Sequence, residues 1–373
     1  MSAWVAASSV VSPLGFTSEE NFAKLRQQIS SLSTVHDTTL SDRPFIASHI
    51  DELECSTGNT KFEKMCIKAT EVALDKVSMD PARTLYILST TKGNIELLKT
   101  TVRNQERLAL HATAQWLADK AGLKHSMVVS NACISGVLAI IVAKRFLHSE
   151  KYDNVVIVGA DVLSQFVIKG FDSLHALSPE PCRPFDAERK GINLGEAAAV
   201  IVLSSKPKKL GIIPSLKITG GGLSNDANHI SGPSRTGLEL GMAVRQALNE
   251  AQKSKEEIDF ISAHGTATLF NDEMEANAFH KLGMQEIPLN SLKGYFGHTL
   301  GAAGVVETVM SMQGLLNDEV MVSKGFEHLG VSLPINVCRK LIRKPLTTCL
   351  KTASGFGGCN AAIILEKDLT YSE

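Results

Sequence analysis

The chain has 373 residues, of which 44% are apolar and 21% are charged, and this composition excludes a disordered protein. Its 38 basic and 39 acidic residues leave a formal net charge of −1, so we expect neither nucleic acid nor a membrane as a partner. The longest apolar runs, Val137–Ala143 and Ala197–Leu203, have seven residues each, whereas a membrane-spanning helix needs about 20. No basic segment precedes an apolar stretch near the N-terminus, which favours a cytoplasmic location.

The seven cysteines show neither CxxC pairs nor the Cys/His spacing of zinc ligands. An odd number of cysteines in a chain expected to stay in the cytoplasm also argues against a disulfide framework. We therefore expect no metal site, and thiols that are mostly buried and unreactive.

Short runs rich in β-branched residues alternate with apolar or amphipathic stretches along the chain. Strands are predicted over Thr84–Ser89, Ser126–Ser130, Asn154–Gly159, Ala198–Leu203, Ile213–Thr219, Ile258–Ala263 and Ala361–Leu365. Helices are predicted over Phe62–Lys76, Ile134–His148 and Leu238–Ala251. This alternation indicates an α/β fold whose parallel strands are covered on both faces. The polar stretch Ser204–Gly211 is the best candidate seam between two halves, residues 1–205 and 206–373.

The first candidate for chemistry is Cys133, which lies between a predicted strand and a predicted helix in the segment SNACISG. Unpaired N–H groups and the positive end of the helix dipole favour a thiolate at such a position, and a thiolate is a nucleophile. For this segment alone, a buried cysteine without a chemical role is the alternative.

Two further segments carry histidines. His264 follows a predicted strand in the segment SAHGTAT, where α/β enzymes place reactive groups. The segment NSLKGYFGHTLGAAG carries Lys293 and His298, and its small residues let a helix approach another backbone closely, with Glu307 on that helix. A structural histidine is the alternative for His264. Close packing explains the small residues but leaves Lys293 and His298 unexplained.

The fourth segment is the glycine-rich loop SGFGGCN over residues 354–360, which precedes the predicted strand Ala361–Leu365. It lacks the Lys and Ser/Thr of a phosphate-binding P-loop and is followed by a strand where a P-loop needs a helix. A phosphate-binding NTPase is therefore not expected.

Taken in this order, the four segments resemble the motifs of the β-ketoacyl synthases, the condensing enzymes of fatty-acid and polyketide synthesis, and most closely the elongating Cys-His-His type. Further segments outside these four also resemble motifs of the family. They are SPLG at 12–15, RPFD at 183–186, GE at 195–196, Asp226 with His229 and Pro233, and Asn271-Asp272 with Glu275. The resemblance spans almost the whole chain. Each motif alone is weak, and the ordered set is specific.

The resemblance implies a thiolase-type fold, in which two similar α/β halves form a layered αβαβα arrangement. The N-terminal half would carry the nucleophilic cysteine and the C-terminal half the catalytic histidines. The implied activity is that of an acyltransferase, which joins an acyl thioester to malonyl-acyl carrier protein by decarboxylative Claisen condensation in fatty-acid, polyketide or polyene synthesis. No cofactor is implied, because carrier proteins deliver both carbon units. The implied partners are an acyl carrier protein and a second subunit, in a homodimer or a heterodimer.

The resemblance also assigns roles to individual residues. Cys133 would accept the acyl group, and His264 and His298 would stabilise the enolate that forms as carbon dioxide leaves. The backbone N–H groups of Cys133 and Phe356 would form an oxyanion hole. The remaining assignments are Lys293 for the electrostatics of the site, Thr266 and Thr268 for the pantetheine arm, Glu307 and Asp272 for support, and Phe356 for gating the acyl pocket.

The chain departs from the family pattern at several places. It is shorter than a typical elongating synthase between Ile29 and Cys133, in the capping and dimer-contact region. Ser354 replaces the usual Phe, Cys359 the usual Thr, and Ala197 a usual Gly. Asn131 and Ile134 flank the nucleophile with side chains that are unusual for the family. His175 lies near a position that is often Arg. These changes leave the chemistry in place and make a dedicated pathway as plausible as ordinary fatty-acid elongation.

Two other functions compete with this interpretation. A thiolase uses two cysteines, and Cys359 offers a second one, but thiolases lack the combination of His264, Lys293 and His298. A non-catalytic partner of the chain-length-factor type would lose the nucleophile, which this chain retains. An acidic carrier protein would dock on a basic face. Lys61, Lys64 and Lys68 share one side of a predicted helix, but a solvated helix face is the preferred interpretation of these lysines.

Overall fold

The computed structural model describes residues 3–51, 53, 59–99, 105–228 and 231–368. Within these ranges the strands of the main sheet are β1 (Ala3–Val11), β4 (Thr84–Ser89), β5 (His125–Val129), β6 (Asn154–Asp161), β8 (Ala197–Ser204), β9 (Leu216–Asn225), β10 (Phe260–Ser262), β11 (Leu289–Asn290), β14 (Thr348–Gly355) and β15 (Cys359–Lys367). Their order across the sheet is β11-β10-β14-β15-β9-β1-β8-β6-β4-β5. The predicted strands are present, although β9 begins three residues later than expected. β1, β11 and β14 were not predicted.

The sheet repeats one pairing pattern on either side of the β9–β1 contact. In one half, β1–β8 and β8–β6 are antiparallel, whereas β6–β4 and β4–β5 are parallel. In the other half, β9–β15 and β15–β14 are antiparallel, whereas β14–β10 and β10–β11 are parallel. The described chain therefore contains two similar α/β halves, as the resemblance implied. β8 ends at Ser204 and β9 begins at Leu216, on either side of the predicted seam.

The prediction that the strands are parallel throughout is wrong for the central strands β1, β8, β9 and β15, which pair in antiparallel fashion. β8 and the centre of β15 are buried on both faces, so they are largely apolar whatever their direction. Apolar runs therefore predicted the strands without predicting how they pair.

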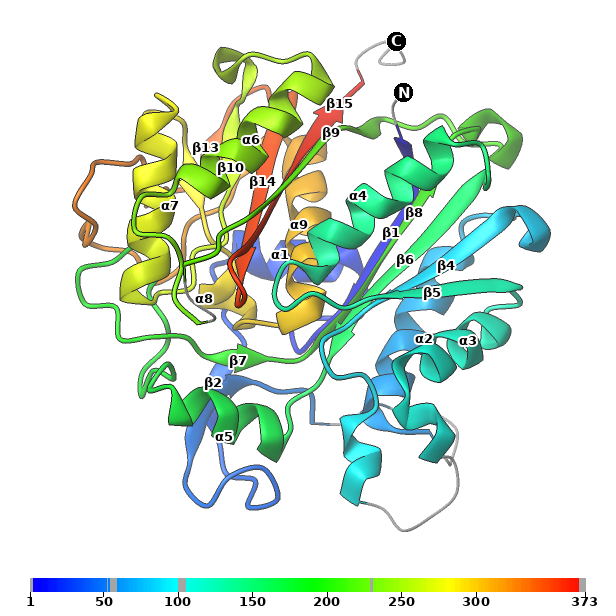
Figure 1. The fold of residues 1–373 in the computed structure, drawn as a ribbon, viewed down its shortest axis with the longest axis horizontal. Helices are drawn as coiled ribbons and strands as arrows, with labels where there is room; N and C mark the ends of the chain where they lie inside the picture. Colours follow the sequence, from blue (N-terminus) through cyan, green and yellow to red (C-terminus); the bar gives the residue numbers. More distant parts are fainter. Residues whose placement is uncertain (1–2, 52, 54–58, 100–104, 229–230, 369–373) are drawn as a thin grey trace.

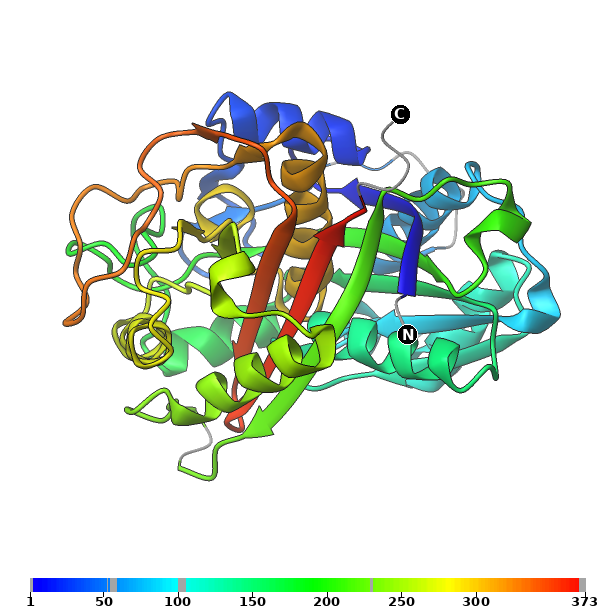
Figure 2. The same cartoon turned by 90° about the horizontal axis from the view of Figure 1, so that it is seen from above.

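The helices form three layers around this sheet. Their bounds are α1 (Ser18–Arg26), α2 (Lys61–Leu74), α3 (Leu110–Lys120), α4 (Ser135–His148), α5 (Gln165–Ser173), α6 (Leu238–Ala251), α7 (Leu269–Lys281), α8 (Lys293–Phe296) and α9 (Ala303–Asn317). α2 and α3 cover the outer face of the N-terminal half, whereas α6 and α7 cover that of the C-terminal half (Figures 1 and 2). α4 and α9 lie between the two halves and complete an αβαβα arrangement.

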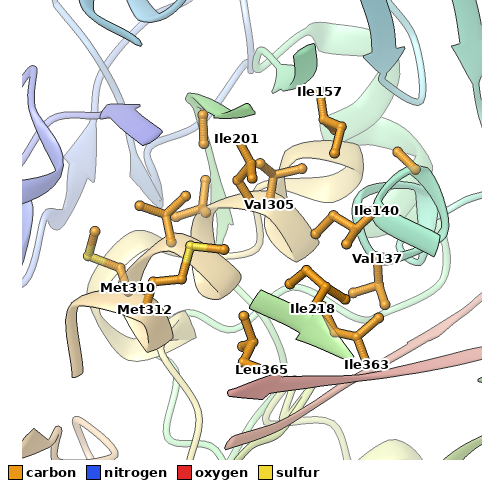
Figure 3. Close-up of a cluster of buried hydrophobic side chains, with 14 of the residues drawn as sticks. Val137, Ile140, Ile157, Ile201, Ile218, Val305, Met310, Met312, Ile363 and Leu365 are labelled. Atoms are coloured by element: carbon orange, nitrogen blue, oxygen red, sulfur yellow. The ribbon is translucent and has the colours of Figure 1, made fainter. Parts of the chain in front are cut away.

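One hydrophobic core joins both halves to the central helices (Figure 3). Its labelled residues are Val137 and Ile140 of α4, Val305, Met310 and Met312 of α9, Ile157 and Ile201 of the N-terminal half, and Ile218, Ile363 and Leu365 of the C-terminal half. The central helices cross at glycines, because a Cβ on Gly136 would lie 2.7 Å from the Val305 nitrogen and one on Gly304 would lie 2.5 Å from the Val137 nitrogen. This close crossing fixes the position of the helix that follows Cys133 against the helix that follows His298.

A smaller sheet lies near the N-terminal ends of the central helices. It pairs β2 (Leu32–Val35), β3 (Phe45–Ser48) and β7 (Leu194–Gly195), and α5 packs beside it (Figure 1). Two further short strands, β12 (Glu319–Val320) and β13 (Ile342–Arg343), pair with each other. Across the described residues, we find no helix that is long and apolar enough to cross a membrane.

Candidate active site

The pseudo-symmetry of the fold brings Cys133 and His298 together. Cys133 follows β5 and precedes α4, and His298 follows β11 and precedes α9, so the two residues occupy corresponding places in the two halves. His264 follows the neighbouring strand β10. One ring nitrogen of each histidine and the Sγ atom of Cys133 all lie within 4.8 Å of one another. The three predicted side chains therefore meet in one site.

The Cys133 thiol is buried and lies against the turn between β14 and β15. A Cβ on Gly355 would lie 3.1 Å from the Cys133 nitrogen, so a larger residue there would crowd the Cys133 backbone. The next residue, Phe356, directs its backbone N–H toward the Cys133 sulfur. The backbone N–H of Phe356 and the nucleophilic sulfur are therefore neighbours.

The resting Cys133 is a neutral thiol, contrary to the prediction of a thiolate at the helix N-terminus. Burial raises the pKa of Cys133 to about 11, and the nearby charges of Lys293 and Lys92 offset only part of that rise. Cys133 also lies two residues ahead of the first residue of α4, where the helix field is weaker than at the N-cap. The thiol must therefore lose its proton as it reacts.

Both histidines are neutral, and their neighbours fix the position of the ring proton. Burial first, and the positive charge of Lys293 second, hold the pKa of each histidine well below its ordinary value. Nδ1 of His298 accepts a hydrogen bond of 3.3 Å from the Leu300 N–H, and Nδ1 of His264 lies 3.3 Å from the Lys293 ammonium. Each ring proton therefore belongs on Nε2, and Nε2 of His298 has no hydrogen-bond partner among the residues that the structure describes.

A buried group of charges lies behind His264. The Glu307 carboxylate accepts a hydrogen bond from Lys293 at 2.7 Å and forms an ion pair with Lys351, whose Nζ lies 2.7 Å from its other oxygen. Lys293 also donates to the His264 carbonyl oxygen at 2.5 Å. Burial works to raise the pKa of Glu307, but the two ammonium groups hold it below the ordinary value. The predicted residues Lys293 and Glu307 therefore belong to one network with His264.

The sequence analysis missed Lys351, which is fully buried on β14. A signal was available, because Lys351 is the one charged residue in the segment TCLKTASG over residues 348–355. A buried lysine needs an anionic partner, and a lysine at such a position predicts one.

Two carboxylates of α7 hold the loop that carries His264. Glu275 accepts from the backbone N–H groups of His264 at 2.8 Å and Gly265 at 2.6 Å, and Asp272 accepts from that of Thr266 at 3.0 Å. Burial raises the pKa of Asp272 to about 7. The structure thus places Asp272 behind the loop and not in the pocket.

A pocket of about 520 Å³ opens from the three central side chains to the surface, and it is lined mainly by apolar residues. Thr266 and Thr268 line it, and their hydroxyl oxygens lie 2.8 Å apart. At the mouth, the Phe356 ring stacks on Phe171 with ring centres 5.7 Å apart. The residues expected to hold a pantetheine arm and to gate the pocket therefore share one cavity with Cys133.

Among the described residues, Cys133, His264 and His298 form the cluster that could hold a metal ion. The Lys293 ammonium 3.3 Å from His264 opposes a cation at this position. Both ring protons also lie on the nitrogen atoms left for ligation. The electrostatics therefore favour a partially negative oxygen over a metal ion.

Other predicted residues lie outside the site. Lys61 is not part of a free basic face, because its ammonium lies 2.5 Å from the buried Glu196 carboxylate. The Cys359 thiol donates to the Asn131 side-chain oxygen at 3.0 Å and does not line the pocket. Cys55 and His229 lie outside the described residues.

Comparison with known protein families matches both halves of the chain. The model described as the N-terminal domain of β-ketoacyl synthases matches residues 117–209, and the one described as the C-terminal domain matches residues 216–326. Together these matches cover more than half of the chain, and the chain belongs to the β-ketoacyl synthase family.

Several curated relatives align with this chain over part of their length. Nodulation protein E of Rhizobium leguminosarum bv. trifolii is 31% identical over 63% of this chain and 60% of its own length. The 3-oxoacyl-[acyl-carrier-protein] synthase 2 of Rhizobium meliloti is 33% identical over 66% of this chain and 61% of its own length. A granaticin polyketide β-ketoacyl synthase of Streptomyces violaceoruber is 27% identical over 83% of this chain and 82% of its own length. The chain thus spans about three fifths of the first two relatives.

Solved structures share the whole fold. A β-ketoacyl synthase from Burkholderia phymatum has a TM-score of 0.89 at 23% identity, covering 98% of this chain and 99% of that chain. The ishigamide ketosynthase/chain length factor has a TM-score of 0.90 at 24% identity, with the same coverage. The fold is therefore the thiolase-type fold of the ketosynthases.

Proposed function

We propose that this protein is a β-ketoacyl synthase that condenses an acyl thioester with malonyl-acyl carrier protein. The observation that carries the proposal is the pair of neutral histidines beside Cys133, each with its proton on Nε2 and its Nδ1 occupied. Two neutral donors next to a nucleophile suit a reaction in which negative charge develops on a carbonyl oxygen.

In the first half-reaction, the Cys133 sulfur attacks the thioester carbonyl of an acyl carrier. The bond from sulfur to the acyl carbon forms, and the bond to the carrier sulfur breaks. The thiol proton of Cys133 ends on the departing carrier thiol. The N–H groups of Cys133 and Phe356 would bind the carbonyl oxygen while it carries negative charge.

In the second half-reaction, a malonyl thioester loses carbon dioxide and becomes an enolate. The Nε2–H groups of His264 and His298 would bind the enolate oxygen. The enolate carbon then attacks the acyl carbonyl on Cys133, the carbon–sulfur bond breaks, and the Cys133 sulfur takes up one proton. The products are a β-ketoacyl carrier, carbon dioxide and the free thiol, so the atoms balance.

The pocket supports the choice of a carrier-bound substrate. A long cavity with two hydroxyl groups on its wall and aromatic rings at its mouth suits a slender amide-containing arm with an apolar chain. We therefore propose an acyl carrier protein as the partner and, by the family resemblance, a second subunit in a homodimer or a heterodimer. A cytoplasmic location and the boundary at residues 205 and 206 are part of the same proposal.

The test is intact mass spectrometry of the protein after incubation with a panel of acyl-carrier thioesters. We expect a mass increase by one acyl group in the wild-type protein and none in Cys133→Ala. Modification of Cys133→Ala to the same extent would place the acyl group elsewhere and overturn the proposal.

The histidine assignment has its own test. His298→Ala should retain acylation of Cys133 within about tenfold, while decarboxylation of the malonyl carrier falls by at least about a hundredfold, the scale of losing an oxyanion donor. Equal losses in both half-reactions would contradict the assignment.

A further inference from the structure

Asp161 is a buried carboxylate between the segment that carries Cys133 and the segment that carries His298. It ends β6 and is 1% exposed. Its contacts are Thr90 Oγ1 at 2.9 Å, Thr91 N at 2.9 Å, Thr91 Oγ1 at 3.0 Å, Lys92 N at 3.2 Å and Gly301 N at 2.7 Å. All of these groups donate, so the arrangement suits an ionised, accepting carboxylate.

Asp161 is connected to the His298 ring through the backbone of Gly301 and Leu300. The Gly301 N–H that binds Asp161 directly follows Leu300, whose backbone is left-handed with a φ of 53°. In this conformation the Leu300 N–H donates to Nδ1 of His298 at 3.3 Å. A left-handed leucine is strained and needs an external contact to hold it. The contact with Asp161 supplies that restraint one residue away.

Asp161 is also connected, through the loop after β4, to the segment that carries Cys133. Asp161 binds the loop from Thr90 to Lys92 at the end of β4, and the Thr90 N–H donates at 3.3 Å to the carbonyl oxygen of Val129, where β5 ends. Cys133 follows four residues later. A second hydrogen bond connects the end of β4 to the segment that follows His298, because the Ser89 hydroxyl donates to the Gly301 carbonyl oxygen at 2.8 Å.

We propose that Asp161 is a positioning residue, which fixes the tautomer and place of His298 relative to Cys133 through the Gly301 N–H. Its charge also faces the nucleophile. The other charged or titratable groups near the Cys133 thiol are Lys92, Lys293, His264 and His298. Asp161 opposes a thiolate at Cys133, whereas Lys92 and Lys293 favour one. The same carboxylate thus orders the second half-reaction, and its charge adds to the effect of burial, which is the main cause of the raised pKa of the thiol.

The substitution Asp161→Asn tests both roles of the carboxylate, the positioning of His298 and the electrostatic effect on the Cys133 thiol. An amide keeps the size but places one NH₂ group against the donors, so at least one backbone contact is lost. We expect alkylation of Cys133 by iodoacetamide at pH 8 to become about three to ten times faster, because removing the negative charge lowers the pKa of the thiol. Decarboxylation of malonyl-carrier thioester should fall at least about tenfold. Loosening of the site would also let water reach the thiol and lower its pKa, so variants that keep the Asp161 charge serve as the control for that effect.

Two companion variants keep the Asp161 charge and disturb the segments that Asp161 connects. A Cβ in Gly301→Ala would lie 2.8 Å from the Asp161 carboxylate oxygen, and Ser89→Ala removes the second hydrogen bond. Both should reduce decarboxylation and leave the pH profile of alkylation unchanged. They also keep the proposal testable if Asp161→Asn does not fold, which thermal unfolding monitors.

The ring nitrogens of His298 give a readout that does not depend on the proposed function. In ¹⁵N-labelled wild-type protein, their chemical shifts should report the Nε2–H form, with the signals assigned by their loss in His298→Gln. Asp161→Asn and Gly301→Ala should show a mixture of both forms. Unchanged His298 signals together with unchanged alkylation would overturn the role of Asp161. Absence of decarboxylation in the wild-type protein, with the expected signals and alkylation, would overturn the proposed function alone.

Discussion

The chemistry of Cys133 depends on a balance between burial and nearby charge. Burial raises the pKa of the thiol to about 11, so the thiolate is a small fraction at neutral pH. That fraction grows about tenfold with each pH unit while the pH stays below the pKa. The reactivity of Cys133 should follow the same dependence.

We therefore predict that alkylation of Cys133 by iodoacetamide accelerates throughout the range from pH 7 to pH 9, with no plateau. The rate is measured by mass spectrometry of the peptide that contains Cys133, and Cys349 in the same digest serves as the inert buried reference. A rate that levels off near pH 7 would show that the site lowers the pKa of the thiol, as the helix position alone had suggested.

Glu307 forms ion pairs with two buried ammonium groups, those of Lys293 and Lys351. Glu307→Gln should lower the free energy of unfolding by about 3–5 kcal/mol, because Lys293 and Lys351 then lose their counter-charge in a buried place. Chemical denaturation at pH 7 measures this loss. The pKa of Glu307 is held below 4.5, so its contribution is present above that pH and is lost as the pH falls further.

Glu319 provides the matched control for Glu307. Its carboxylate also lies between two cations, Arg26 at 2.8 Å and Arg343 at 3.1 Å, but these side chains are 39% and 69% exposed. Glu319→Gln should therefore cost no more than about 1 kcal/mol. Equal losses in the two variants would show that burial of the cations does not set the cost.

At the scale of the elements, the position of the site depends on the crossing of α4 and α9. A Cβ on Gly136 would lie 2.7 Å from the Val305 nitrogen, which is backbone and has little freedom to move. Gly136→Ala should lower the free energy of unfolding by about 1–3 kcal/mol and reduce acyl transfer, because Cys133 moves away from His298. Denaturant titration and the acylation assay measure the two effects.

A second helical glycine tests whether space is the cause. At Gly241 on α6, the nearest atom to a new Cβ would be the end of the Arg245 side chain, at 3.8 Å. Gly241→Ala should raise the free energy of unfolding by about 0.5–1 kcal/mol, since alanine favours helix and fits. A loss at Gly241 similar to that at Gly136 would attribute both results to helix propensity and not to the crossing.

The elements also show how far the sequence could predict this structure. Apolar runs predicted β4 and α6 to the residue, because both follow simple local patterns. They did not predict the antiparallel pairing of β1 with β8, which depends on distant segments. The motifs predicted Cys133, His264 and His298 as one site through the family resemblance. Lys351 and Asp161 were missed, because their partners come from other parts of the chain.

For the whole molecule, the main question is whether each half can fold without the other. The main sheet is joined at the centre only by two residue pairs between β1 and β9, Ala3 with Ile218 and Trp4 with Lys217, within the described residues. The apolar core is joined much more extensively, since α4 and α9 pack on each other and on both halves of the sheet. Each half alone would expose the face that the other half covers.

We therefore predict that residues 1–205 and residues 206–373, produced separately, each lack a cooperative thermal transition, whereas the two fragments produced together form a folded 1:1 complex. The break falls beside the short 3₁₀ helix Pro207–Leu210, which lies between β8 and β9 and outside the sheet. Circular dichroism and analytical ultracentrifugation measure the outcome, and the intact chain cleaved between residues 205 and 206 serves as the control. Cooperative unfolding of either fragment alone would show that the shared core is not required, because one half could then bury enough apolar surface by itself.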